Sequence, residues 1–220
     1  MRILAFLVIS LNLSLYAAAQ NIVILQDPVT NKMFSSTKYS EINGTPFLID
    51  KWINGSASIE KGTYHNVELK LDAYANQVLF KYADETFEFQ DDVKSFVLKP
   101  GLKDSASYLY FKKGISGPSL KANQYVQVLA EGKISFYKSD VKLLSEVNEI
   151  NRGVVQAFNT ASRYYLIKGS NAQLIKLSKS DILDHMKDRE KEVNEFVTTN
   201  KISFKREGDI ATLIKYYNSL

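Results

Sequence analysis

Apolar and polar residues alternate with a period of two along much of the chain after residue 47, which is typical of strands with one buried face. The clearest case is residues 67–72, where Val, Glu, Leu, Lys, Leu and Asp follow in turn. Lys61-Gly62 is a turn-forming pair between two such runs. Successive strands are therefore expected to pair as antiparallel hairpins.

Further strand-like runs continue to residue 177 and are separated by turn-forming residues. They lie at residues 57–60, 63–71, 78–82, 86–89, 93–98 and 108–111, and as two similar strand–turn–strand segments at 125–137 and 164–177. The two segments are either a duplicated hairpin or two hairpins of independent origin. Residues 145–162 are polar and poorly periodic, and we interpret them as a loop or a broken helix.

The periodicity changes from two to 3.6 near residue 180. Ser180 is a suitable helix cap, apolar residues then repeat at helical spacing, and Asn200 is a natural stop. A second helix is expected from about Asp209. The predicted fold is α+β, an antiparallel β-rich meander or small barrel-like sheet of about eight short strands followed by a C-terminal antiparallel helical pair.

The N-terminus has the pattern of a signal peptide over residues 1–19, with Arg2, an apolar run and three alanines at 17–19. A retained membrane anchor needs roughly 20 apolar residues, and this run is shorter. Residues 20–46 are expected to form an extended lead-in that opens with an apolar stretch at 22–25. The β-rich domain is expected at 47–178, with the helical pair at 179–220 packed on the same unit.

The composition is that of an ordinary folded protein, with 45% apolar and 24% charged residues. Cysteine is absent, which excludes disulfides, thiolate metal sites and thiol nucleophiles. The net charge is +4, but basic and acidic residues are interspersed. A nucleic-acid partner is not expected, because it requires basic residues clustered on one surface, and no segment after the signal peptide is long and apolar enough to span a membrane.

No catalytic or nucleotide-binding motif occurs in the chain. The two histidines are His65, in a predicted strand, and His185, which has Asp181 and Asp188 at helical spacing on either side. That cluster is the best candidate for a metal site, but the same spacing describes a capped, charged helix surface, which is the interpretation that we prefer. We expect no metal, no cofactor and no enzymatic activity.

Aromatic residues are the remaining candidates for binding, since the chain has 13 tyrosines, 12 phenylalanines and one tryptophan. Trp52, Tyr74 and Tyr125 are the candidate ligand contacts, because exposed rings stack on sugars or peptides. The competing interpretation is that these rings pack the sheet.

Three segments carry a resemblance to a group of proteins. They are GTPFLIDKWING at residues 44–55, GTYHNVELKLD at 62–72 and IATLIKYYNSL at 210–220. With them the chain resembles uncharacterised exported proteins of Bacteroidota-type bacteria. The resemblance implies an envelope or extracellular location and carries no activity or site residues with it.

The leading hypothesis is a non-enzymatic, exported binding or interaction module of the bacterial cell envelope, periplasmic or extracellular. Its partner is expected to be an envelope protein or a glycan. One alternative is an envelope-acting hydrolase whose carboxylates converge only in the fold. Another is a structural component of an envelope assembly.

Overall fold

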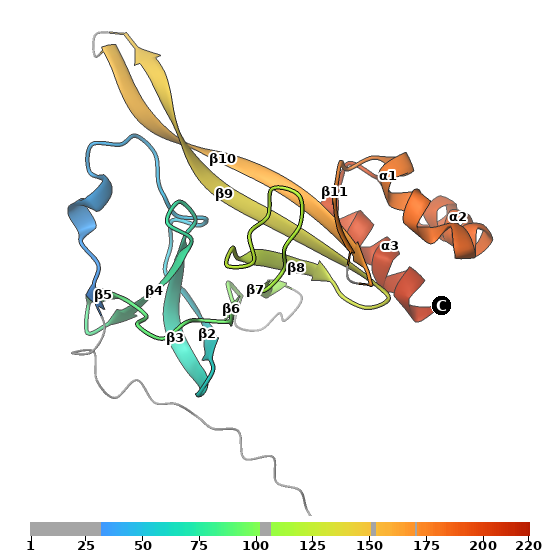
Figure 1. Ribbon diagram of the computed structural model, residues 1–220, viewed down its shortest axis with the longest axis horizontal. Coiled ribbons are helices and arrows are strands. Elements are labelled where there is room, and N and C mark those ends of the chain that lie inside the picture. Colours follow the sequence, from blue (N-terminus) through green and yellow to red (C-terminus); the bar gives the residue numbers. More distant parts are fainter. Residues whose placement is uncertain (1–31, 102–106, 151–152, 170) are drawn as a thin grey trace, which may run out of the picture.

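The computed structural model describes residues 32–101, 107–150, 153–169 and 171–220, so the predicted signal peptide and the apolar stretch at 22–25 lie outside the described residues. These residues form one antiparallel sheet of eleven strands in the order β1-β5-β4-β3-β2-β6-β7-β8-β9-β10-β11 (Figure 1). The strands are β1 (Lys32–Met33), β2 (Ile53–Ile59), β3 (Gly62–Asp72), β4 (Gln77–Tyr82), β5 (Glu85–Glu88), β6 (Ser95–Leu98), β7 (Leu109–Lys112), β8 (Val126–Ala130), β9 (Ile134–Glu149), β10 (Gly153–Lys168) and β11 (Asn171–Ile175). The helices are the 3-10 helices η2 (Ser36–Tyr39) and η4 (Asp184–Arg189) and the α-helices α1 (Lys179–Leu183), α2 (Glu190–Thr199) and α3 (Glu207–Ser219).

The predicted fold class is wrong in two respects. The sheet is a large open one, because its outermost strands β1 and β11 do not pair with each other, and it has eleven strands instead of about eight. The C-terminal region is also not a simple helical pair. Its first part is a stretch of 21 residues, 179–199, in which α1, η4 and α2 follow one another with a kink at Met186.

Strands β2 to β7 enclose the first hydrophobic cluster of the molecule. The predicted alternation at residues 67–71 is confirmed, since Val67, Leu69 and Leu71 are buried. Asp72 was expected on the solvent-exposed face of the strand, yet it is fully buried. Its carboxylate accepts hydrogen bonds from the Tyr39 hydroxyl at 2.8 Å and from two backbone N–H groups.

Gly55 is required where β2 crosses close to β6. A Cβ atom at this position would lie 2.1 Å from the carbonyl oxygen of Val97. Only glycine lets the two backbones approach this closely.

Strands β9 and β10 form a continuous hairpin of 16 residues in each strand, about 50 Å long. The hairpin extends well past β8 and β11, which pair only with its base, and we call residues 139–150 and 153–163 the arm (Figure 1). Residues 145–162 were predicted as a loop or a broken helix, and that prediction is wrong. Most side chains in this region are at least partly exposed on both faces, so the sequence has no buried face to generate alternation.

The lead-in segment fastens the arm to the first half of the sheet. Asn43 bridges the edge of β10, where its N–H donates to Gln156 and its carbonyl accepts from Phe158, both at 2.9 Å. The Phe158 ring packs edge-on against Tyr39 and Tyr74. These contacts bring together residues that are far apart in sequence. We call Tyr39, Asn43, Tyr74 and Phe158 the arm clamp.

The helices cover one face of β8 to β11 and enclose a second hydrophobic cluster. The first helix is capped by Ser178 instead of Ser180, because the Ser178 hydroxyl accepts a hydrogen bond from the N–H of Asp181. The Asn218 side chain bonds to both main-chain groups of Ile134 and to the Glu131 carbonyl, which fixes the end of α3 against the β8–β9 turn. No helix in the described part of the chain has the length and apolar character needed to cross a membrane.

Candidate functional site

A groove opens where β7 and β8 diverge in the middle of the sheet. The two strands pair at only three positions, Tyr110 with Val128, Phe111 with Gln127 and Lys112 with Val126. Beyond Tyr110 and Val128 they separate, and the resulting groove has a volume of about 580 Å³, within the range of small-ligand sites. Its lining comprises residues 95–97, 108–112 and 127–131 together with Lys215 of α3.

Aromatic side chains from β6 and β7 form one wall of the groove. Tyr110 is 47% exposed, and Tyr108 lies on the same side of the strand two residues before it. Phe111 points the other way and stacks on Phe96, with ring centroids 4.6 Å apart and planes 7° from parallel. This buried pair holds the strand in place. The exposed Tyr110 ring remains available for a ligand, whereas the Tyr108 ring is half-buried and has the Lys99 ammonium 5.7 Å from its centre.

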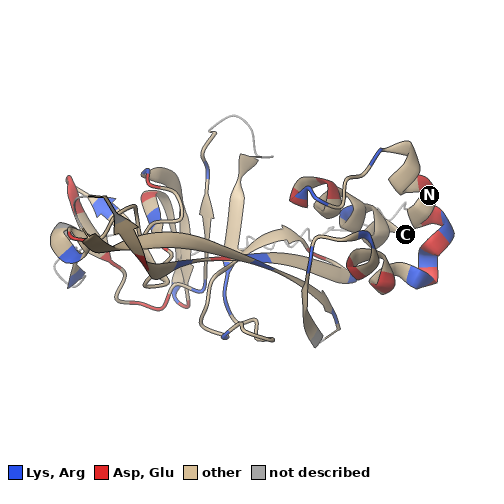
Figure 2. Ribbon diagram, turned by 90° about the horizontal axis from the view of Figure 1, so that it is seen from above, with Lys and Arg blue, Asp and Glu red and all other residues tan. Residues whose placement is uncertain are grey.

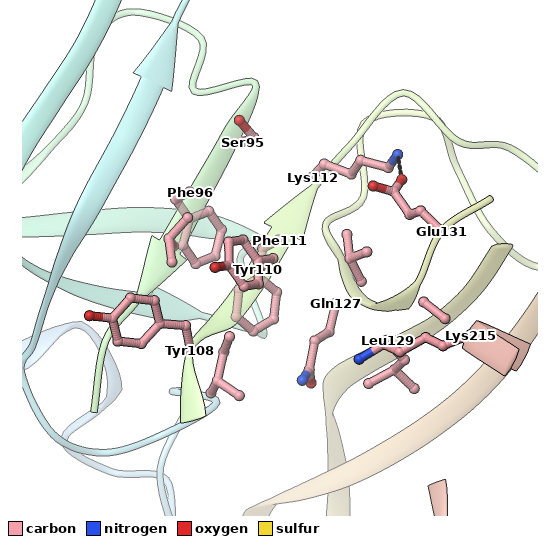
Figure 3. A pocket seen from close by; sticks show the side chains of 14 residues that line it. Ser95, Phe96, Tyr108, Tyr110, Phe111, Lys112, Gln127, Leu129, Glu131 and Lys215 are labelled. Atoms are coloured by element: carbon pink, nitrogen blue, oxygen red, sulfur yellow. Dashed lines mark hydrogen bonds and ion pairs between the residues drawn. The ribbon is translucent and has the colours of Figure 1, made fainter. Parts of the chain in front are cut away.

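The other wall combines polar and apolar side chains. Figure 3 shows Gln127, Leu129 and Lys215 across the opening from the β7 side chains, with Lys112 linked to Glu131 at one end. Lys215 is exposed and forms neither an ion pair nor a hydrogen bond with any other residue that the structure describes. It is therefore a cation that a ligand can reach.

Glu131 is the one carboxylate among the described residues that line the groove. Partial burial would raise its pKa, but hydrogen bonds from the Lys112 ammonium and from the Tyr137 hydroxyl, the latter at 2.8 Å, hold the pKa of Glu131 below its ordinary value. Glu131 is thus ionised near neutral pH. It is not placed to act as a general acid, which requires a raised pKa.

A pair of carboxylates does converge elsewhere in the fold. Lys138 of β9 lies 3.3 Å from Asp140 and 3.2 Å from Glu207 at the start of α3. Burial would lower the pKa of Lys138, but these two carboxylates and Tyr164 outweigh it and raise that pKa. The cluster is therefore a set of ion pairs that ties α3 to the sheet, with its carboxylates already occupied by a cation.

None of the three predicted ligand contacts lines the groove. Tyr125 is 7% exposed, and its hydroxyl donates to the Val93 carbonyl at 2.6 Å. Burial raises its pKa. Tyr125 therefore packs the first hydrophobic cluster.

The other two predicted contacts also lie outside the groove. Tyr74 is 42% exposed, but its ring packs edge-on against Tyr39 and Phe158. Trp52 is half-buried, and the Lys70 ammonium lies 5.0 Å from the centre of its ring. Both rings have neighbours within the protein, so the groove and these residues are separate places on the surface.

The histidine cluster does not come together as a metal site. The His185 Nδ1 atom lies 2.9 Å from the Asp181 carbonyl oxygen, and its Nε2 atom lies 2.9 Å from the side chain of Gln173. The Asp181 carboxylate instead bonds to Ser178, and that of Asp188 bonds to the Tyr217 hydroxyl. The described residues include no group of three or more potential metal ligands.

Sequence reasoning missed Tyr108, Tyr110 and Lys215 as groove residues. The strand at 108–111 was predicted, and its alternation places the two tyrosines on one face. What the sequence lacks is any indication that β7 and β8 diverge at this point, or that α3 brings Lys215 beside them.

Comparison of the chain with protein-family models, with curated proteins and with solved structures gives no match.

Proposed function

We propose that this protein is an exported, non-enzymatic binding module of the bacterial cell envelope, which takes its ligand in the groove between β7 and β8. The observation that carries the proposal is the lining of that groove. Among the residues that the structure describes, it combines the exposed Tyr110 ring, the half-buried Tyr108 ring, a reachable cation at Lys215 and a single carboxylate that is already ionised and paired. Such a lining supports recognition by stacking and charge, and its described residues include no second carboxylate for hydrolysis.

Export is supported by the pattern of residues 1–19, which matches a cleaved signal peptide. On this proposal the native protein begins at Gln20. Intact-mass measurement of protein purified from its own cells checks this, and a mass that includes residues 1–19 contradicts it.

The binding proposal is tested by thermal unfolding of the purified protein with a panel of envelope oligosaccharides, peptides and divalent metal ions. A specific ligand at a hundredfold its Kd should raise the Tm by roughly 5 to 10 °C. Tyr110→Ala should abolish that rise because it removes an exposed ring of the groove. Tyr82→Ala is the matched control, since Tyr82 is similarly exposed, at 44%, but lies on β4 and does not line the groove. A panel without any rise, or a rise that survives Tyr110→Ala, overturns the proposal.

A further inference from the structure

The divergence of β7 and β8 leaves backbone groups without a partner strand. The N–H of Lys113 donates to the Lys94 carbonyl on the β6 side, at 3.2 Å. Because backbone groups alternate in direction along a strand, those of Tyr110 and Tyr108 point toward β8. Tyr110 is matched by Val128, whereas Tyr108 has no partner on β8 in the described part of the chain.

On the opposite side of the opening, β8 also has residues without register partners. Leu129 occupies a β-bulge, and it has no register partner on β7 or on β9 among the described residues. Ala130 pairs with Phe136 of β9 but with no described residue of β7. The groove is therefore bounded on both sides by strand backbone.

We infer that the groove is a strand-addition site, in which an extended peptide segment pairs with the backbone of Tyr108, just before β7, and lies alongside the β8 bulge at Leu129. This inference rests on the proposed function and names its ligand class. Main-chain groups give affinity in this mode, and alternate side chains of the ligand give specificity.

The side chains around the opening define the ligand further. Alternate ligand residues would face opposite sides of the sheet. Tyr110 is exposed on one side, whereas Leu109 and Leu129 offer apolar surface to a segment that lies between the strands. Lys215, which has no ion-pair partner among the described residues, favours a carboxylate on the ligand. The peptide is thus apolar at alternate positions and acidic near α3.

The experiment is selection of a phage-displayed library of random twelve-residue peptides on the immobilised full-length protein, with counter-selection on Tyr110→Ala. Enriched sequences should alternate apolar residues and carry an Asp or Glu. The best peptide is then synthesised with and without N-methyl groups at alternate residues, and both forms are measured by isothermal titration calorimetry. N-methylation keeps every side chain but removes main-chain donors, and it should weaken binding roughly tenfold or more.

Lys215→Gln should weaken the acidic peptide several-fold and leave its glutamine-substituted form unchanged, whereas Lys191→Gln, at an exposed position on α2, should change neither. If no peptide is enriched, or if N-methylation leaves the Kd unchanged, the inference is overturned. In that case, a Tyr110-dependent rise in Tm with an oligosaccharide would still support the proposed function, but with a ligand other than a peptide. Loss of both results would remove the proposed function as well.

Discussion

Glu131 connects three elements at the mouth of the groove. Its carboxylate receives hydrogen bonds from Lys112 of β7 and Tyr137 of β9, and its carbonyl accepts from Asn218 of α3. The Lys112 ammonium also lies 5.0 Å from the centre of the Tyr137 ring. Glu131, in the turn between β8 and β9, therefore links the two walls of the groove.

Lys112→Met should lower the free energy of unfolding by about 0.5 to 1 kcal/mol at pH 7, a small effect because Glu131 is half exposed and the ion pair is screened by solvent. The folded-state pKa of Glu131 is depressed, so its contribution is present above the ordinary value of about 4.3 and is lost as the pH falls through the folded pKa. The difference between wild type and variant should consequently shrink from pH 5 toward pH 3 in urea denaturation.

Lys61→Met is the control for this measurement, because Lys61 is 77% exposed and lies 3.6 Å from Asp91. Its effect should be close to zero at every pH. A Lys112→Met difference that is constant with pH would show that Glu131 is not the group whose charge the lysine stabilises.

At the residue scale the sequence indicates which side chains share a face but not what covers that face. Tyr125 and Tyr110 both occur beside apolar residues in or next to strands, yet Tyr125 is packed under Phe96 and Tyr110 is exposed in the groove. Their difference depends on loops and strands from distant parts of the chain. Period-two alternation carries no information about these.

The arm is the element that depends most on long-range contacts. It exposes Leu143, Val147, Ile150 and Val154, and its covered part is the clamp around Phe158. A two-stranded hairpin is at best marginally stable by itself in water. The clamp therefore determines whether the arm is ordered.

Phe158→Ala should remove the ring contacts with Tyr39 and Tyr74 and destabilise the arm by about 3 kcal/mol, at the low end for a buried phenylalanine. Amide hydrogen exchange measured by mass spectrometry should become more than tenfold faster in peptides from the arm, with little change in β2 and β3. Val154→Ala is the control, because Val154 is 66% exposed and its truncation should leave exchange unchanged. Unchanged protection of the arm in Phe158→Ala would show that the Asn43 backbone bonds alone hold it.

The sequence could not predict the arm, because the arm has no continuous buried face. Its strands pair with each other over 16 consecutive positions, but much of the surface on both sides faces solvent, so polar and apolar residues follow no period. The shorter strands with one buried face, such as β3, were predictable because burial imposes alternation. The cap of the first helix was displaced by two residues because Ser178 and Ser180 satisfy the same rule.

Charge distribution over the whole molecule agrees with its mixed composition. Figure 2 shows Lys and Arg interspersed with Asp and Glu on the C-terminal helices. Most of the ion pairs are on the surface, such as Lys187 with Asp184 and Arg189 with Glu192, and contribute little individually. Stability must come chiefly from apolar burial, which is divided between two main clusters.

Within the sheet, the two clusters are joined through a short ladder. The first is enclosed by β2 to β7 and the second by β8 to β11 with the helices, and the β7–β8 ladder between them has three residue pairs. The arm clamp adds a mainly aromatic connection. Hydrogen bonds add others, from the Lys142 N–H to the Ala73 carbonyl at 3.1 Å and between the Asn76 side chain and the backbone of Asn123 and Tyr125. A length of 220 residues permitted either one unit or two, and the sequence could not decide between them because it does not show how few pairs join β7 to β8.

We predict that the clusters unfold as separate cooperative units. Leu98→Ala removes a side chain that is 2% exposed in the first cluster, and Ile214→Ala removes a fully buried one in the second, at a cost of about 2 to 5 kcal/mol each. In native-state hydrogen exchange, Leu98→Ala should accelerate amides of β2 to β6 and spare those of α2 and α3, whereas Ile214→Ala should do the reverse. The reason is that three ladder pairs and the few contacts through Asn76, Lys142 and Phe158 are too few to transmit a loss of several kcal/mol between the two clusters. Acceleration of both regions by either variant would instead mean that the groove lies inside one cooperative unit, and that strands β7 and β8 cannot separate to admit a ligand without weakening the whole fold.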